Sequence, residues 1–178
     1  MRIKQATNWY VITGGPGSGK TTTINLLKAR GYKTTIEHAR HYLETQLVMG
    51  KTIEEVRKNQ AIFQTGILQM QIAQEAALSP SEVVFLDRAI PDALAYYRYL
   101  SLPVDQILTE ALRTASYKKI FVLDCLPIVN DYVRREDEAA QKMIHQLLID
   151  VYRSMDFPII QVPLLPPDKR VDFILKNL

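Results

Sequence analysis

The sequence predicts an α/β fold in which a parallel sheet of about five strands is sandwiched between helices. Short apolar runs alternate with helical patterns along the chain, and this alternation is typical of parallel sheets with right-handed crossovers. Two of the runs, Val83–Leu86 and Ile120–Leu123, are continuously apolar, as strands covered on both faces are. Each of these runs ends in an aspartate, Asp87 and Asp124.

The elements can be justified in order along the chain. Residues 9–13 are all β-branched or aromatic and predict the first strand. A glycine cluster leads from it into a helix over 21–30, for which Gly31 is a plausible stop. Residues 33–36 predict a second, more exposed strand, and apolar runs predict further strands at 83–86, 120–123 and 159–162. Apolar spacings of three and four predict helices over 39–48, 53–78 with Gly66 as a possible break, 91–116 in two segments, 137–155 and 168–178.

Length and composition indicate one globular domain over residues 1–178. The single cysteine, Cys125, excludes a disulfide scaffold, so we expect a cytoplasmic protein. The 22 Lys and Arg against 19 Asp and Glu leave a scattered net charge of +3, which disfavours nucleic acid as a partner. No apolar run approaches the ~18 residues of a membrane span, and the first residues are not expected to be a signal peptide. These patterns leave the oligomeric state unknown.

The glycine cluster satisfies the Walker A pattern G-x-x-x-x-G-K-[ST] in full, between a predicted strand and a predicted helix. Glycines allow consecutive N–H groups to form an anion nest, and the helix adds its positive dipole end. Lys20 is expected on the β- and γ-phosphates of ATP, and the Thr21 hydroxyl on Mg²⁺. The expected nucleotide-binding residues are Gly14, Gly15, Pro16, Gly17, Ser18, Gly19, Lys20, Thr21 and Thr22.

Asp87 ends an apolar strand and is followed at once by Arg88. Asp87 is expected to hold Mg²⁺ or to accept a proton, and Arg88 to grip a phosphate or the acceptor. The alternative is that the two form a local structural pair. Asp124 is the rival strand-end carboxylate, although a turn-forming aspartate explains it too. Asp92 is either a helix cap or an acceptor contact.

Glu37 and Arg40 lie three residues apart where the second strand gives way to a helix, so both can share one helix face. A carboxylate and a guanidinium at that position suit an acceptor hydroxyl and its neighbours. The alternative is a surface ion pair. The three histidines, His38, His41 and His145, have no partner at a metal-binding spacing and are expected at the surface.

A charged stretch at about 127–140 predicts a lid that closes over the transferring phosphate. Arg134 is expected to stabilise the charge that develops there, with Arg135 as the weaker contributor. A solvated charge run is the alternative.

These motifs resemble those of small "AAA domain" P-loop proteins related to the ribosylnicotinamide kinase domain of a bacterial NAD-biosynthesis regulator, and more distantly those of deoxynucleoside and thymidylate kinases. Beyond the Walker A loop, residues 37–40 match E-x-x-R and residues 87–96 match D-R-x-x-P-D-x-x-A-Y. The matches at 130–134 and 170–175 are looser. The resemblance implies that Glu37 is the acceptor's base and that Asp87 and Arg88 serve Mg²⁺ and the phosphates. Glu37 and Asp87 are therefore both candidate bases.

Together these observations predict a Mg-ATP-binding kinase that transfers the γ-phosphate to a small nucleoside-like or nucleotide-like acceptor. ATP is preferred over GTP because no Asn-Lys-x-Asp guanine signature is present. The alternative is a nucleotide-binding regulatory ATPase or switch without a small-molecule acceptor. Glu37, Arg40 and Arg88 distinguish the two, since a switch needs no acceptor pocket.

Overall fold

The computed structural model describes residues 5–127 and 138–178, and its centre is a parallel sheet. The five strands lie in the order β2-β3-β1-β4-β5. All four neighbouring pairs are parallel. The bounds are β1 (Trp9–Thr13), β2 (Lys33–Thr34), β3 (Val84–Asp87), β4 (Lys119–Leu123) and β5 (Ile159–Val162). The predicted α/β fold with about five parallel strands is confirmed, although β2 is shorter than the expected 33–36.

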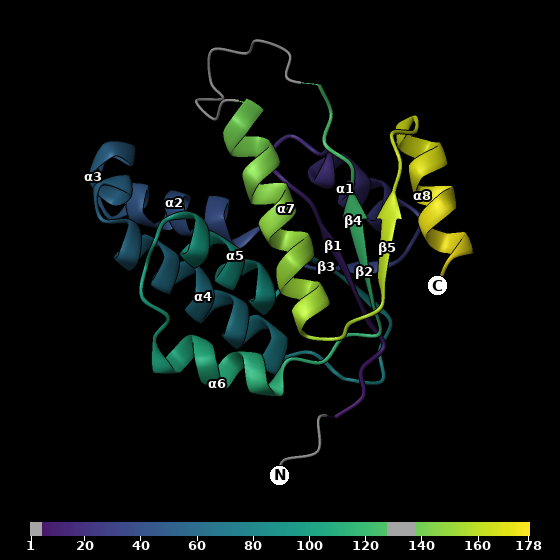
Figure 1. Cartoon of the computed structure of the whole chain (residues 1–178), viewed down its shortest axis with the longest axis horizontal. Helices are drawn as coiled ribbons and strands as arrows, with labels where there is room; N and C mark the ends of the chain where they lie inside the picture. The colour runs from purple at the N-terminus through teal and green to yellow at the C-terminus, as the bar shows by residue number, and fades with distance from the viewer. Residues whose placement is uncertain (1–4, 128–137) are drawn as a thin grey trace.

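Helices cover both faces of this sheet. In Figure 1, α7 crosses in front of the strands, α1 lies behind them and α8 lies on the β5 side. The helices α4, α5 and α6 form a group beside α7. The helix bounds are α1 (Lys20–Ala29), α2 (His38–Val48), α3 (Ile53–Lys58), α4 (Gln60–Ala76), α5 (Ile90–Tyr99), α6 (Gln106–Thr114), α7 (Glu138–Ser154) and α8 (Pro167–Lys176).

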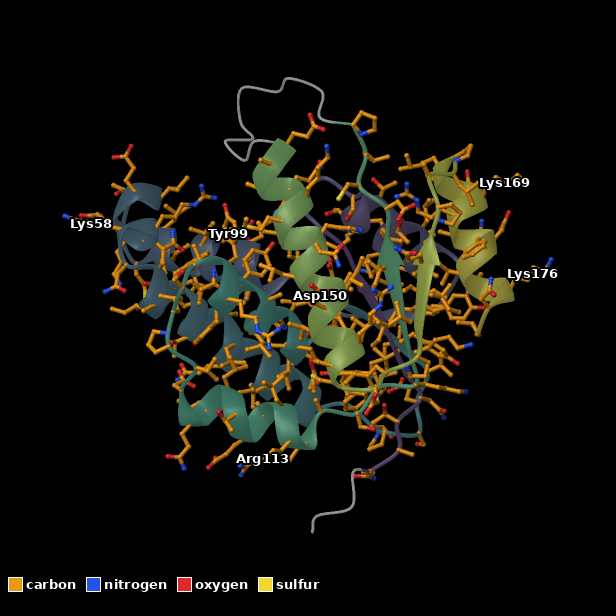
Figure 2. All side chains as sticks on the ribbon, viewed as in Figure 1. Lys58, Tyr99, Arg113, Asp150, Lys169 and Lys176 are labelled. Carbon is orange, nitrogen blue, oxygen red and sulfur yellow. The ribbon has the colours of Figure 1, made fainter. Side chains whose placement is uncertain are left out.

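The core has one layer on each face of the sheet because strand side chains alternate in direction. Along β1, Val11 points to the face that α7 covers and packs there with Tyr152. Its neighbour Ile12 points to the other face and packs with Leu27 of α1 and Ile174 of α8. Both strand residues are fully buried. Most charged side chains lie on the outside instead, and Figure 2 shows Lys58 of α3, Arg113 of α6 and Lys176 of α8 pointing away from the body.

The helix expected over 53–78 is two helices, and its break is not at Gly66. The chain leaves helical geometry at Asn59, where φ is −111° and ψ is 89°. The Asn59 side chain then accepts a hydrogen bond from the N–H of Ile62 and so caps α4. Gly66 lies inside α4, where a Cβ atom would come within 2.2 Å of the Tyr42 ring. Gly66 is therefore a site of close approach between α2 and α4, which pack together.

This contact predicts that Gly66→Ala destabilises the protein. In an open helix the same change stabilises by about 1 kcal/mol. Here the added methyl overlaps Tyr42, and overpacking of this kind costs about 1–3 kcal/mol. Thermal unfolding should show a lower Tm for Gly66→Ala. In a Tyr42→Ala background the ring is absent, so adding Gly66→Ala should lower the Tm less than it does in the wild type. A higher Tm for the single variant would mean that the Tyr42 ring moves aside at no cost.

The predicted lid, with Arg134 and Arg135, falls largely on 128–137 and lies outside the described residues. Its first residue, Pro127, follows β4, and its last residues open α7. Among the helices that the structure describes, none has the length and apolar character needed to cross a membrane.

Candidate active site

Most of the predicted site residues line one cavity at the carboxyl ends of β1, β3 and β2. Ligands of open parallel sheets bind at this edge. The cavity has a volume of about 660 Å³, which suits a small-molecule site. It is lined by residues from all the predicted motifs that the structure describes, namely Pro16, Gly17, Ser18, Gly19, Lys20, Thr21, Thr22, Glu37, Arg40, Asp87, Arg88 and Asp92. The structure therefore brings together motifs that lie up to 76 residues apart in the sequence.

The two strand-end aspartates lie on opposite sides of β1. Asp87 ends β3 and pairs in register with Ile12, directly before the phosphate loop. Asp124 follows β4 on the other side of β1, and its N–H donates to the carbonyl oxygen of Val162. Among the described residues, only Asp87 of the two lines the cavity.

The phosphate loop spans residues 14–21 between β1 and α1, and its shape depends on glycine. Gly14 has φ 150°, and a Cβ atom there would come within 2.6 Å of the carbonyl oxygen of Leu123. Gly19 has φ 82° and is the N-cap of α1. Glycine has no side chain with which to cap a helix, so the first-turn N–H groups of α1 remain available to an anion. These conformations are compatible with the anion nest that the Walker A pattern predicts, and phosphate binding by the loop stays a prediction.

Three side chains from α7 and α8 hold this loop in place. The N–H of Gly15 donates to Nδ1 of His145 at 3.2 Å. Nε2 of Gln141 donates to the carbonyl oxygen of Pro16 at 2.7 Å, and Nη1 of Arg170 to that of Ser18 at 2.7 Å. His145 is half-buried on the loop, so its expected surface position is wrong. Arg170 lies in the segment 170–175, which matches the family only loosely, and the sequence alone gives no sign that it contacts the loop.

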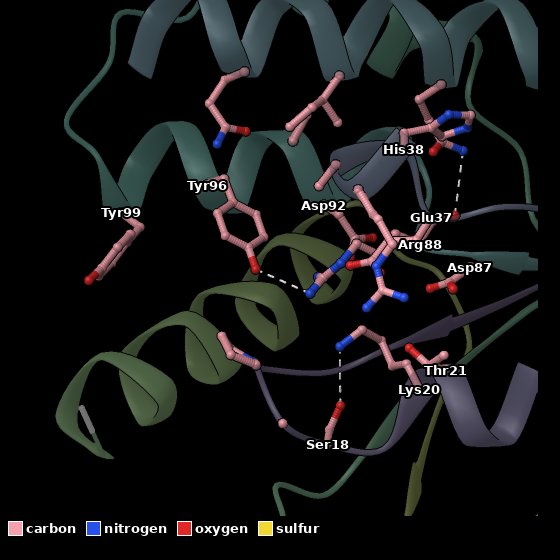
Figure 3. Close-up of a pocket in the computed structure, with 18 of the residues that line it drawn as sticks. Ser18, Lys20, Thr21, Glu37, His38, Asp87, Arg88, Asp92, Tyr96 and Tyr99 are labelled. Atoms are coloured by element: carbon pink, nitrogen blue, oxygen red, sulfur yellow. Dashed lines mark hydrogen bonds and ion pairs between the residues drawn. The ribbon is translucent and has the colours of Figure 1, made fainter. Parts of the chain in front are cut away.

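Lys20 is buried under the loop, with 8% of its surface exposed. Its ammonium group donates to the carbonyl oxygens of Gly14 and Gly15, both at 3.2 Å, and to Oγ of Ser18 at 3.3 Å. Figure 3 shows Lys20 extending across the mouth of the loop toward Ser18. Burial, with the nearby charge of Arg88, lowers the pKa of Lys20 to about 7. An anionic ligand at this position would restore the charged form.

Asp87 supplies a buried carboxylate oxygen without a partner. The residue is 5% exposed, and its Oδ1 atom has no hydrogen-bond partner among the described groups. Burial, together with the charge of Glu37, raises the pKa of Asp87 to about 6. Its N–H donates to Oγ1 of Thr35, which fixes the end of β3. An orphaned carboxylate oxygen in a cavity suits a hydrated cation or a proton.

The protein oxygens in the cavity fit a Mg²⁺ ion that binds together with the nucleotide phosphates. Over residues 5–127 and 138–178, no cluster of three or more His, Cys, Asp or Glu side chains could hold a metal by itself. Mg²⁺ is commonly bound by one or two protein oxygens with water and substrate phosphates. Asp87 and the exposed Thr21 both line the cavity and offer such a pair of oxygens.

Glu37 and Arg40 enter the cavity from the start of α2. Glu37 is the N-cap of this helix and half-buried, and Arg40 lies one turn on and is exposed. Both line the cavity, as the acceptor interpretation requires. His38, between them, is 5% exposed, and its Nε2 atom lies 2.6 Å from Oε1 of Gln74. Its expected surface position is therefore wrong, whereas His41 is exposed as predicted.

Arg88 is held firmly, but by Asp92 and Tyr96 rather than by Asp87. Its Nη1 atom lies 3.1 Å from Oδ1 of Asp92, and its Nη2 atom donates to the Tyr96 hydroxyl at 3.1 Å (Figure 3). Asp92 also accepts hydrogen bonds from Oγ1 of Thr13 at 2.5 Å, the N–H of Ala89 at 3.2 Å and the hydroxyl of Tyr152. Asp92 thus caps α5 and orients Arg88 toward the cavity. A direct acceptor contact by Asp92 stays a prediction.

The far part of the cavity is lined by α4 and α5 residues that the motif analysis did not include. Apolar and aromatic side chains from this region, Phe63, Ile67, Leu68, Tyr96 and Tyr99, surround the amides of Gln64 and Gln71. Gln64 is 7% exposed and Gln71 5% exposed. Both lie on the buried stripe of α4. Polar residues within an otherwise apolar helix stripe are the signal that could have identified them.

Solved structures share this fold at low sequence identity. NadR protein in complex with NR superposes with a TM-score of 0.69 and 17% identity over 96% of this chain and 49% of the NadR chain. Deoxyadenosine kinase from M. mycoides with bound dATP has a TM-score of 0.60 and 16% identity over 95% and 98% of the two chains. Thymidylate kinase from Ehrlichia chaffeensis has a TM-score of 0.60 and 14% identity over 97% and 99%. The present chain spans about half the length of the NadR chain, and these likenesses show a P-loop kinase fold.

Comparison with sequences places the chain in a family. No curated protein matches it. A family model described as "AAA domain" matches residues 9–170, which include the phosphate loop, every described residue predicted for the site, and Arg170. Because this match covers most of the chain and the fold agrees, the chain belongs to the AAA domain family of P-loop proteins.

Proposed function

We propose that this protein is a Mg-ATP-dependent kinase that transfers the γ-phosphate to a hydroxyl or phosphate group of a small nucleoside-like or nucleotide-like acceptor. The observation that carries the proposal is the continuity of the cavity. Its lining runs from the phosphate loop through Asp87 to Glu37 and the apolar pocket of α4 and α5. A nucleotide switch needs only the phosphate loop and a carboxylate for Mg²⁺, and has no need of an acceptor pocket. The solved kinases with the same fold support the same interpretation.

The phosphate loop would bind the triphosphate of ATP. Its backbone nest and the start of α1 receive the phosphate oxygens, and Lys20 adds a positive charge at the β- and γ-phosphates. Thr21 and Asp87 would hold Mg²⁺, which when bound neutralises charge that builds up on the phosphates. Arg88, oriented by Asp92 and Tyr96, faces the same cavity and offers a guanidinium to a phosphate or to the acceptor.

The strand order supports different roles for the two candidate bases. Glu37 follows β2, at the edge of the sheet, whereas Asp87 ends β3, between β2 and the loop-bearing β1. Of the two carboxylates, Asp87 is therefore nearer to the phosphate loop, and Glu37 lies toward the acceptor pocket. In the transfer to a hydroxyl, the acceptor oxygen forms a bond to the γ-phosphorus as its proton passes to Glu37. The bond from the γ-phosphorus to the bridging oxygen breaks, and ADP leaves.

The test is ADP release with a panel of nucleosides and nucleoside monophosphates, each with and without Mg²⁺. We expect at least one acceptor to raise ADP release well above hydrolysis without an acceptor, and to appear as a phosphorylated product. Lys20→Ala, prepared in parallel, controls for contaminating kinases. Hydrolysis that no acceptor stimulates would instead support a regulatory ATPase, and Arg134 would then lose its proposed role at a transferring phosphate.

A further inference from the structure

The turn that carries Arg88 has an unusual backbone conformation. Arg88 has φ 64°, in the left-handed region that residues other than glycine seldom adopt. Its own N–H is used, because it donates to the carbonyl oxygen of Ile12 in β1. Such strained conformations persist where surrounding groups hold them, and they cluster at functional sites. The groups that hold the rest of this turn are therefore informative.

Two buried carboxylates accept the next two amides of the turn. Asp92 accepts the N–H of Ala89 through Oδ2, and Glu75 accepts the N–H of Ile90 through Oε1 at 3.2 Å. Gln71, one turn before Glu75 on α4, donates to the same Oε1 atom at 2.8 Å and to the carbonyl oxygen of Arg88 at 3.5 Å. Glu75 thus contacts the turn directly at Ile90 and indirectly, through Gln71, at Arg88 itself.

Glu75 is placed where it cannot meet a ligand. It is 6% exposed, and its second oxygen accepts a hydrogen bond of 2.8 Å from the hydroxyl of buried Tyr117. In the described part of the chain, neither Glu75 nor Tyr117 is among the residues that line the cavity, whereas Gln71 and Arg88 are. Burying a carboxyl group costs free energy that an apolar side chain would not cost. Among the described residues, the hydrogen bonds of the Glu75 side chain go to the turn, to Gln71 and to Tyr117.

We propose that Glu75 is a positioning residue, which acts through Ile90 and Gln71 to keep Arg88 directed into the cavity. The inference deepens the proposed kinase function and rests on it for its kinetic consequence. Arg88 would then be held twice, at its backbone by Glu75 with Gln71 and at its guanidinium by Asp92 with Tyr96. A site held in this way before the ligand arrives stabilises developing charge without reorganisation.

The test compares Glu75→Leu with Glu75→Gln. The amide of glutamine retains an oxygen for Ile90 and Gln71 and can donate to Tyr117, so Glu75→Gln should keep kcat within about threefold of the wild type. Glu75→Leu removes all three hydrogen bonds and should lower kcat about 10- to 100-fold, with a small change in the KM for ATP. Hydrogen exchange of the amides of residues 88–90 should become faster in Glu75→Leu and remain slow in Glu75→Gln.

Thr65→Val is the matched control. It removes another hydrogen bond between α4 and α5, the one between the hydroxyl groups of Thr65 and Tyr97, away from the turn. Its kcat and the exchange of residues 88–90 should not change, even where Tm falls. If Glu75→Leu does not fold, Tyr117→Phe removes one hydrogen bond to Glu75 and should shift both measurements in the same direction by a smaller factor.

The inference is overturned if the amides of residues 88–90 exchange at the same rate in Glu75→Leu as in Thr65→Val. If Tyr117→Phe replaces Glu75→Leu, the same comparison applies to it. A kcat loss in Glu75→Gln as large as in Glu75→Leu would overturn it too. A wild-type protein that phosphorylates no acceptor contradicts the proposed function, whereas the exchange measurements still decide the role of Glu75.

Discussion

Lys20→Ala should raise the Kd for Mg-ATP by about 100-fold or more and lower turnover by about 10³-fold, without loss of the fold. The ammonium group is the cation that the loop itself contributes, and electrostatic groups of this kind at developing charge are worth about 10²–10³-fold each. The loop keeps its shape in the variant because His145, Gln141 and Arg170 hold it from outside.

The stability of the ligand-free variant provides a second measurement. The folded protein lowers the pKa of Lys20 from 10.5 to about 7, chiefly by burial, so the charged lysine destabilises the fold below pH 10.5. The Tm of Lys20→Ala at pH 7 should therefore equal or exceed that of the wild type. Lys28→Ala, an exposed lysine on the same helix, is the charge-matched control. Equal ATP binding by the two variants would remove the basis of the phosphate-loop assignment.

Asp87→Asn should lower turnover by more than about 100-fold with a modest effect on ATP affinity. The substitution keeps the shape of the side chain and the backbone bond to Thr35, but it removes the charge at the orphaned oxygen. A loss of this size is expected whether the carboxylate holds Mg²⁺ or accepts a proton. Single-turnover kinetics with an acceptor from the panel would measure it.

The pH profile tests the same residue. Burial, with the charge of Glu37, raises the pKa of Asp87 to about 6, so the wild-type kcat/KM should fall as pH decreases through about 6, where the carboxylate takes up a proton. The residual activity of Asp87→Asn should lack this decrease. Asp124→Asn is the matched control, because Asp124 follows β4 on the other side of β1, and it should retain most activity. Inactivity of Asp124→Asn alone would show that the wrong strand end was chosen.

The fold and the phosphate loop could be predicted because their signals are local. Continuous apolar runs mark strands buried on both faces, and a run of eight residues, 14–21, carries the whole Walker A pattern. The conformations of Gly14 and Gly19 depend on the residues themselves, since only glycine adopts them without strain. For these features each residue's own chemistry and near neighbours suffice.

The errors arose where a distant segment determines the environment. Gly66 looked like a helix break, but the Tyr42 ring of α2 explains its lack of a side chain. His145 looked exposed, yet it accepts the N–H of Gly15, 130 residues away in the sequence. A periodicity pattern carries no information on such pairs, because it describes one element and not the element packed against it.

The choice between Asp87 and Asp124 separates the two sources of information most clearly. By itself, the sequence determined that two carboxylates end buried strands and that a phosphate loop precedes α1, because strand ends and glycine turns are local features. The sequence also favoured Asp87, because Arg88 follows it, but it could not show which strand end faces the cavity, since β3 and β4 both lie beside β1. Only the tertiary structure decided which of them lines the cavity, because residues of α2, α4 and α5 line it together with Asp87, whereas Asp124 lies on the other side of β1 and is not among its lining residues.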